Sequence, residues 1–188
     1  MGKSDKGKAE IRLTGSGGQG VILASIILAE AAIMADKNAV QSQSYGPEAR
    51  GGMCKAEVII DEDNIGFTKV TQPTFLLALT QESLDTYAKS LPKDCLIMAD
   101  ASLTIPEGIP EESVMLVPIL ETAKDKVGKT FTANIVALGA INEALNLVPF
   151  ENLDEAVKKH IPAGTEELNS KALQEGRNLK PVRKGKKD

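Results

Sequence analysis

The sequence predicts an α/β fold, in which a mixed, mostly parallel sheet lies between helical layers in a three-layer α/β/α arrangement. Short apolar runs alternate with longer segments of helical periodicity along the chain, and several runs are apolar throughout, as in parallel strands buried on both faces. Between the first run and the first helical segment lies the turn Gly15-Ser16-Gly17-Gly18-Gln19-Gly20. A glycine turn at this position is Rossmann-like.

Each element is expected where the apolar pattern changes period. The expected strands are 11–14, 39–44, 55–60, 75–80, 96–100 and 114–119. The expected helices are 19–35, 82–90, 120–127, 132–146, 153–160 and 165–178. The loop between strands 39–44 and 55–60 has no room for a crossover helix, so this pair should be antiparallel or not adjacent.

Length and composition favour one domain, because 188 residues, 42% of them hydrophobic, can bury a single core. We expect the domain to span 11–178, between a flexible leader at 1–10 and a basic tail at 179–188. The chain has no Trp and a net charge of −4, with basic residues concentrated in the tail. An acidic body with few aromatic residues does not favour a nucleic-acid ligand.

No membrane segment or metal framework is expected. The apolar run 21–35 is shorter than the roughly 20 residues of a membrane span, and no signal peptide is recognisable, so a cytoplasmic location is expected. Cys54 and Cys95 belong to no C-x-x-C pair, so the chain encodes neither a zinc site nor an iron–sulfur site. Gly128-Lys129-Thr130 has Ala123 where a Walker A loop needs glycine. His160, the single histidine, has no nucleophile motif beside it.

The glycine turn predicts an anion site formed by Gly15, Ser16, Gly17, Gly18, Gln19 and Gly20. Its backbone N–H groups lie at the positive end of the following helix dipole. The spacing is G-x-G-x-x-G, but the dinucleotide fold also needs an acid after the second strand to hold the ribose. That strand ends in Gln41-Ser42-Gln43-Ser44, and Asp36 precedes it. NAD is therefore disfavoured, and a phosphate site remains.

A second candidate segment is the loop 44–52, Ser44-Tyr45-Gly46-Pro47-Glu48-Ala49-Arg50-Gly51-Gly52, just past the end of an expected strand. Ligands of open α/β sheets bind at such strand ends. The planar guanidinium of Arg50 suits phosphate or carboxylate. Pairing of Arg50 with Glu48 or Glu57 to order the loop is an equally good interpretation.

Two helices have unusual surfaces. Helix 21–35 is apolar almost all round, and helix 132–146 carries the small residues Ala133, Ala137, Gly139 and Ala140. Each pattern alone is more typical of a central helix in one core. Together they raise the alternative of a subunit interface, including a possible homodimer of the isolated chain.

The glycine turn and the Ser-Tyr-Gly-Pro-Glu-Ala-Arg-Gly-Gly loop together resemble the gamma subunit, or gamma domain, of the 2-oxoacid:ferredoxin oxidoreductases. The resemblance extends from Ile11 to about Arg177 and includes Asn134-Ile135-Val136-Ala137-Leu138-Gly139. It implies an α/β/α subunit of a complex that oxidatively decarboxylates a 2-oxoacid to acyl-CoA and reduces ferredoxin. The loop is more similar to the 2-oxoglutarate and related branches than to the indolepyruvate branch.

The resemblance also implies a division of labour. Alpha and beta subunits, with a ferredoxin-like delta subunit, would carry thiamine diphosphate, Mg²⁺ and the iron–sulfur clusters, and this chain would not be catalytic alone. The glycine turn would face the diphosphate of coenzyme A or a catalytic subunit, with Tyr45 and Arg50 on the same edge. Two alternatives stay open: an NAD(P)-binding oxidoreductase domain, and a non-catalytic assembly scaffold.

Overall fold

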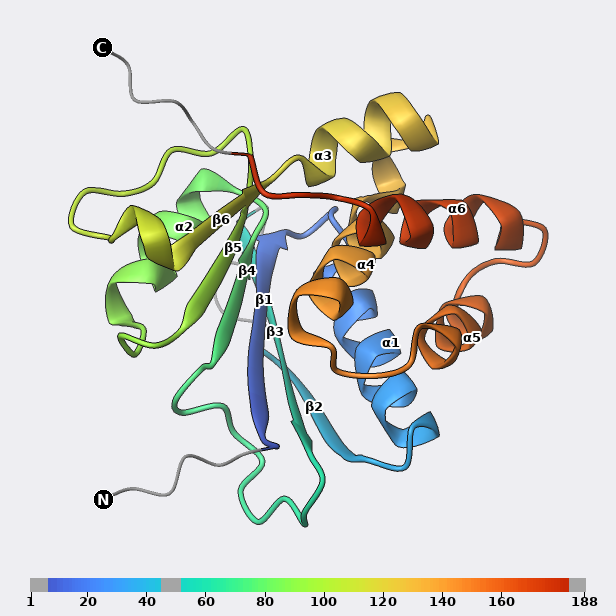
Figure 1. The fold of residues 1–188 in the computed structure, drawn as a ribbon, viewed down its shortest axis with the longest axis horizontal. Coiled ribbons are helices and arrows are strands. Elements are labelled where there is room, and N and C mark those ends of the chain that lie inside the picture. The colour runs from blue at the N-terminus through green and yellow to red at the C-terminus, as the bar shows by residue number, and fades with distance from the viewer. Residues whose placement is uncertain (1–6, 45–51, 183–188) are drawn as a thin grey trace.

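A six-stranded sheet forms the centre of the molecule (Figure 1). The computed structural model describes residues 7–44 and 52–182. The strand order is β2-β3-β1-β4-β5-β6. The strands are β1 (Ala9–Ser16), β2 (Asn38–Ser44), β3 (Met53–Asp61), β4 (Phe75–Ala78), β5 (Leu96–Asp100) and β6 (Val114–Val117).

The sheet is mixed, as the sequence predicts. Strands β1, β4, β5 and β6 are parallel, whereas β3 is antiparallel to β1 and β2 is antiparallel to β3. The short connection between β2 and β3 therefore joins an antiparallel pair. Strand β3 also separates β2 from β1, so the first strand–helix–strand unit does not form the adjacent parallel pair of a dinucleotide fold.

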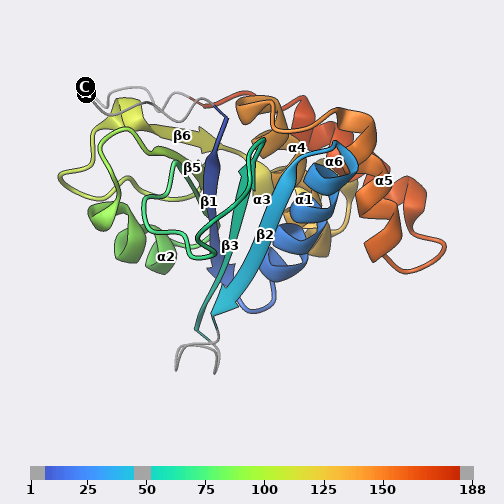
Figure 2. The same ribbon diagram turned by 90° about the horizontal axis from the view of Figure 1, so that it is seen from below.

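Helices cover both faces of the sheet (Figures 1 and 2). On one side lies α2, and on the other α1 and α4 pack on the strands with α5 and α6 outside them. The three-layer α/β/α prediction is confirmed. The helices are α1 (Val21–Met34), α2 (Gln81–Tyr87), α3 (Ile119–Glu121), α4 (Ala133–Leu145), α5 (Phe150–His160) and α6 (Glu166–Arg177). Short 3₁₀ turns are η2 (Ala88–Ser90), η3 (Glu111–Ser113) and η5 (Thr130–Thr132).

Two apolar clusters fill the space between these layers. Ile11 and Leu13 of β1 point toward α1 in the larger cluster, whereas Leu76 and Ala78 of β4 point toward α2 in the smaller one. The alternation follows from the two-residue repeat of a strand. The larger cluster explains why α1 is apolar almost all round, because the sheet, α4 and α5 surround it.

The small residues of α4 are explained by α6. A Cβ at Gly139 would lie 2.1 Å from the carbonyl oxygen of Leu173, and one at Gly176 would lie 2.0 Å from that of Val136. The two helix backbones touch at these glycines, and only glycine leaves room for that approach. Most of the apolar surface of α1 and the small residues of α4 are thus used inside the chain, as the core interpretation predicts, whereas Ile33 of α1 is 58% exposed.

The segment expected to form helix 120–127 differs from a regular helix. It begins as the single turn α3 and continues as the π-helix η4 (Thr122–Val127), which ends at Gly128 with φ 86°. The buried carboxylate of Asp100 accepts a hydrogen bond from the Leu120 N–H at 2.8 Å, which fixes the start of this segment to the end of β5. π-Helices are rare and frequently lie at functional sites.

Candidate functional site

The glycine turn connects the carboxyl end of β1 to the first turn of α1. Gly20 is the residue before the helix and has φ 69°, a left-handed conformation that favours glycine. Its carbonyl oxygen accepts a hydrogen bond from Asn134 Nδ2 of α4, and a Cβ at Gly20 would lie 2.6 Å from that nitrogen. Among the residues that the structure describes, no side chain caps the helix, which leaves the N–H groups of its first turn available.

Gln19 fixes the shape of the turn. Its Oε1 accepts a hydrogen bond from the Ser16 N–H at 2.7 Å, and its Nε2 donates to the Leu79 carbonyl after β4 at 3.3 Å. A Cβ at Gly15 would lie 2.5 Å from Gln19 Oε1. The internal packing of the chain therefore accounts for Gly15 and Gln19, and the side-chain amide of Gln19 is occupied in holding the turn.

Gly17 and Gly18 differ from these neighbours. A Cβ at either position would meet nothing within 4 Å, and neither residue has a positive φ. Neither crowding nor backbone conformation within the described chain requires glycine there. Both residues lie on the outside of the turn, where something approaching from outside would come close to the backbone.

A cavity of about 640 Å³ opens beside this part of the turn. One wall is formed by the turn, and the other by the segment from α3 to the start of α4. The lining residues are Ser16, Gly18, Gln19, Leu120, Glu121, Lys124, Asp125, Thr130, Phe131 and Ala133. The volume falls within the range of about 300–1,000 Å³ typical of ligand pockets.

Sequence reasoning missed this second wall. Residues 120–133 follow β6, which is separated from β1 by β4 and β5 in the sheet order, so their approach to the glycine turn depends on tertiary packing. Phe131 is 64% exposed although it is a large apolar residue. A lone Phe after Gly128-Lys129-Thr130 gives no sign in the sequence that it lines a cavity.

The predicted site residues Tyr45 and Arg50 lie outside the described residues. The strand ends on either side of that segment are nevertheless placed. Met53 pairs with Ser16 in the β1–β3 ladder, and Ser44 pairs with Lys55 in the β2–β3 ladder. The described ends of β2 and β3 are therefore at the same edge of the sheet as the glycine turn.

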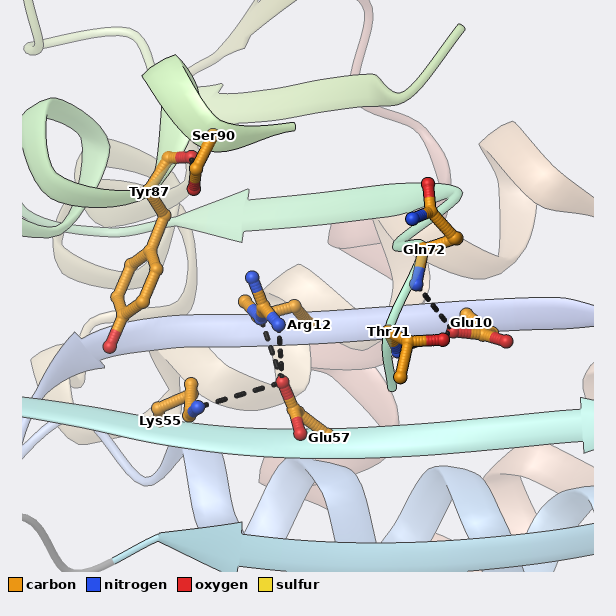
Figure 3. A network of polar contacts seen from close by, with 8 residues as sticks. All are labelled: Glu10, Arg12, Lys55, Glu57, Thr71, Gln72, Tyr87 and Ser90. Carbon is orange, nitrogen blue, oxygen red and sulfur yellow. Dashed lines mark hydrogen bonds and ion pairs between the residues drawn. The ribbon is translucent and has the colours of Figure 1, made fainter. Parts of the chain in front are cut away.

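A separate polar network lies on the α2 side of β1 and β3 (Figure 3). Arg12 Nε donates to Glu57 Oε1 at 2.8 Å, Lys55 Nζ lies 3.7 Å from the same oxygen, and the Tyr87 ring faces the Arg12 guanidinium at 5.4 Å. The Glu57 side chain is 12% exposed, so its charge is balanced within the fold. We interpret this network as a set of structural contacts that hold β1, β3 and the end of α2 together.

Glu10 of the same strand holds the chain before β4 (Figure 3). Its Oε2 accepts hydrogen bonds from the N–H groups of Thr71 and Gln72. Burial acts to raise the pKa of Glu10, but hydrogen bonds from Lys8, Gln72 and Thr71 outweigh it, and the pKa is lowered. This carboxylate is thus used to position backbone.

The described residues offer little acid–base or metal chemistry. Burial raises the pKa of the Cys95 thiol to about 11 and also raises that of Cys54, so neither is an activated thiolate. His160 contacts Glu30 on the far side of α1 from the sheet. Within residues 7–44 and 52–182, no three His, Cys, Asp or Glu side chains are grouped to hold a metal ion.

Comparison with known proteins identifies the family. The family model described as pyruvate ferredoxin/flavodoxin oxidoreductase matches residues 10–179. The chain belongs to this family. It is 44% identical to the 2-oxoglutarate synthase subunit KorC of Methanothermobacter marburgensis over 179 residues, which are 92% of this chain and 96% of that protein. It is 41% identical to the KorC of Methanocaldococcus jannaschii, over 91% of this chain and 93% of that protein.

Solved structures support the same assignment. The gamma subunit of a keto/oxoacid ferredoxin oxidoreductase from Geobacter sulfurreducens is 45% identical with a TM-score of 0.80, covering 90% of this chain and 94% of that one. The expected membership of the gamma subunits of 2-oxoacid:ferredoxin oxidoreductases is confirmed. A 2-oxoglutarate:ferredoxin oxidoreductase from Magnetococcus marinus shares the fold, with a TM-score of 0.82 at 22% identity, and this chain matches 31% of its length. Among the described residues, no helix is both long and apolar enough to span a membrane.

Proposed function

We propose that this chain is the gamma subunit of a 2-oxoglutarate:ferredoxin oxidoreductase and supports coenzyme A binding and assembly of the complex. Alpha and beta subunits, with a ferredoxin-like delta subunit, carry thiamine diphosphate, Mg²⁺ and the iron–sulfur clusters. They decarboxylate the 2-oxoacid and pass its electrons to ferredoxin. This chain presents coenzyme A to the acyl group that the catalytic subunits form.

The choice of 2-oxoglutarate is supported by the curated relatives. Four of them are 2-oxoglutarate synthase subunits at 35–44% identity, whereas the ketoisovalerate and the pyruvate/ketoisovalerate relatives are 30–35% identical. A protein of the same fold, from Magnetococcus marinus, is recorded with 2-oxoglutarate, coenzyme A and succinyl-CoA bound. The substrate carboxylates themselves would be recognised in the partner subunits.

The observation that carries the coenzyme A proposal is the open space at Gly17 and Gly18. Nothing in the described chain requires glycine at these positions; both lie at the carboxyl edge of the sheet, and Gly18 lines the cavity. A glycine lets a diphosphate approach the backbone closely, and the uncapped first turn of α1 supplies N–H donors and a positive dipole end. The diphosphate of coenzyme A fits these requirements.

The NAD(P) alternative is less well supported. Strand β3 lies between β1 and β2, so the end of β2 is not beside the turn as in a dinucleotide fold, and β2 ends without an acid. Titration of the isolated chain with NADH would test this alternative directly. Saturable binding in the micromolar range would favour it over the coenzyme A proposal.

The proposal is tested by enlarging the outer face of the turn. Gly18→Ala in the reconstituted complex should raise the KM for coenzyme A about tenfold and leave the KM for the 2-oxoacid unchanged. The added methyl group would keep the diphosphate from approaching the backbone closely enough to form a charge-assisted hydrogen bond with an N–H group of the turn. Gly66→Ala is the matched control, since a Cβ at Gly66 also meets nothing within 4 Å and Gly66 lies in the connection between β3 and β4. Unchanged coenzyme A kinetics in Gly18→Ala would contradict the proposal.

The assembly-scaffold alternative gives a different outcome. If the turn contacts a partner subunit, Gly18→Ala should reduce recovery of the complex in co-purification and leave the coenzyme A KM of the assembled fraction unchanged.

Arg50→Ala tests the second predicted segment in the same assay. We expect a raised coenzyme A KM; unchanged kinetics would remove Arg50 from the site.

A further inference from the structure

We propose that the wall opposite the glycine turn recognises the adenosine 3′-phosphate end of coenzyme A, with Phe131 stacking on the adenine and Lys124 pairing with the 3′-phosphate. This inference rests on the proposed function and extends it from the diphosphate to the nucleotide end of the same ligand. It assigns a specificity role to two side chains on the α3–η4–η5 segment. Both line the cavity that begins at Gly18 and Gln19.

Phe131 is placed for stacking by its exposure. It is 64% exposed, although the next two residues, Thr132 and Ala133, are buried. The other exposed large hydrophobic residues of the described chain, Ile33, Phe67 and Val182, do not line this cavity. An aromatic ring at a cavity mouth offers a flat face to a base, and such stacking is worth about 1–3 kcal/mol.

Lys124 is the cation of the cavity. It projects from the π-helix η4 between Glu121 and Asp125, which also line the cavity. Within residues 7–44 and 52–182, Lys124 forms no ion pair of its own, whereas Lys158 and Lys159 pair with acids on α5. The two neighbouring carboxylates repel phosphate elsewhere on this wall. Lys124 is the one cation among the residues that line the cavity, so a phosphate monoester bound on this wall would lie beside Lys124 and away from the two carboxylates.

The two walls divide the ligand between them. The glycine turn supplies backbone donors, which suit a diphosphate held close to the chain. The opposite wall supplies a ring and a point charge, which suit a base and a terminal phosphate. An adenine dinucleotide shares the base and the diphosphate but has no 3′-phosphate, so Lys124 is the residue that would distinguish coenzyme A from such ligands.

The test compares coenzyme A with 3′-dephospho-coenzyme A as acyl acceptors of the reconstituted complex. In the wild type, the KM for the dephospho compound should be about tenfold higher. Lys124→Ala should raise the KM for coenzyme A about tenfold, leave that for the dephospho compound unchanged, and so abolish the discrimination. Lys126→Ala is the matched control, because Lys126 lies on the same π-helix but does not line the cavity.

Phe131 gives a different pattern in the same assay. Phe131→Ala should raise the KM for both acceptors about tenfold and preserve their ratio, because the adenine is common to both. Phe67→Ala, which removes an exposed ring outside the cavity, should leave both values unchanged. In every variant the kcat and the KM for the 2-oxoacid report whether the complex remains intact.

A direct measurement complements the kinetics. Coenzyme A should protect Lys124 of the wild-type complex from an amine-reactive acetylating reagent at least fivefold, measured by mass spectrometry, and the dephospho compound should protect it less. Lys126 in the same sample reports the general reactivity. Lys124 that is unreactive without coenzyme A, or equally reactive with and without it, contradicts the inference.

The inference and the proposed function can fail separately. If Gly18→Ala raises the coenzyme A KM while Lys124→Ala and Phe131→Ala do not, this assignment of the second wall is wrong and the proposed function stands. If all three variants leave coenzyme A kinetics unchanged, both are wrong.

Discussion

Gly139 and Gly176 lie where α4 crosses α6, and Gly17 and Gly18 lie on the outer face of the turn before α1. At the first pair an added Cβ would overlap backbone atoms, whereas at the second it would meet nothing within 4 Å. The same residue type thus serves the packing of the chain in one region and leaves a surface open in the other. The comparison separates glycines that the fold requires from glycines whose explanation lies outside the described chain.

The largest effect is expected at the helix crossing. Gly139→Ala places a Cβ about 2.1 Å from the Leu173 carbonyl oxygen, and backbone cannot move aside without separating α4 from α6. We expect a loss of about 3 kcal/mol in the free energy of unfolding, measured by urea denaturation, despite the higher helix propensity of Ala. A variant as stable as the wild type would show that this crossing is looser than the structure indicates.

Replacing Gly20 should have an effect on stability between those expected for the two glycine pairs. Gly20→Ala combines a left-handed φ of 69° with a Cβ 2.6 Å from Asn134 Nδ2, and should cost about 1–2 kcal/mol of unfolding free energy. In an Asn134→Ala background the steric part disappears. The cost of Gly20→Ala should therefore be smaller there, and equal costs in the two backgrounds would exclude a clash with Asn134.

A smaller effect is expected from the contact between α1 and the end of α5. The hydrogen bond from His160 lowers the pKa of Glu30 below 4.5, burial opposes this, and the positive charge of Lys159 adds to the lowering. A lowered carboxyl pKa stabilises the fold above the unfolded-state pKa and loses that contribution as pH falls through the folded-state value. At pH 7, Glu30→Gln should cost about 0.5 kcal/mol, a small value because Glu30 is partly exposed.

The pH dependence is the test of this contact. The difference in unfolding free energy between wild type and Glu30→Gln should be present above the unfolded-state pKa of about 4.5 and be lost progressively as pH falls from there through the lower folded-state pKa. Glu155→Gln is the control, since Glu155 contacts Lys159 but not His160. A difference that persists at pH 3 would mean that the carboxylate charge is not the source of the stability.

Local sequence patterns predicted most of the fold because its strands and helices are short-range features. The apolar runs located all six strands. The short β2–β3 connection predicted a pair that is antiparallel or not adjacent, and the structure shows the antiparallel pair. Two strands are shorter than predicted. Strand β4 ends at Ala78 because Thr80 caps α2, and β6 ends at Val117 because Pro118 follows. The π-helix η4 was missed because its residues read equally well as an α-helix.

The candidate site was predicted only in part. Gly15–Gly20 could be found because the turn is contiguous in sequence. Lys124 and Phe131 lie near the turn only because of the order of the strands in the sheet, and no local sequence pattern encodes that order. Sequence also could not rank the six turn residues. The contacts of Gln19 with Ser16 and Leu79, and of Gly20 with Asn134, separate residues that build the turn from those that face outward.

The smallest effect on stability is expected at Gly17. Gly17→Ala adds a methyl group to open space at a φ that Ala can adopt, so the unfolding free energy should change by no more than about 0.5 kcal/mol in either direction. In the complex, the same change should raise the coenzyme A KM, as for Gly18→Ala. Gly139→Ala should show the opposite combination, a large loss of stability with a near-normal coenzyme A KM in the fraction that assembles. If Gly17→Ala instead unfolds the isolated chain, then the fold itself requires this glycine. Gly17 would then no longer support the proposal that the turn binds an external ligand.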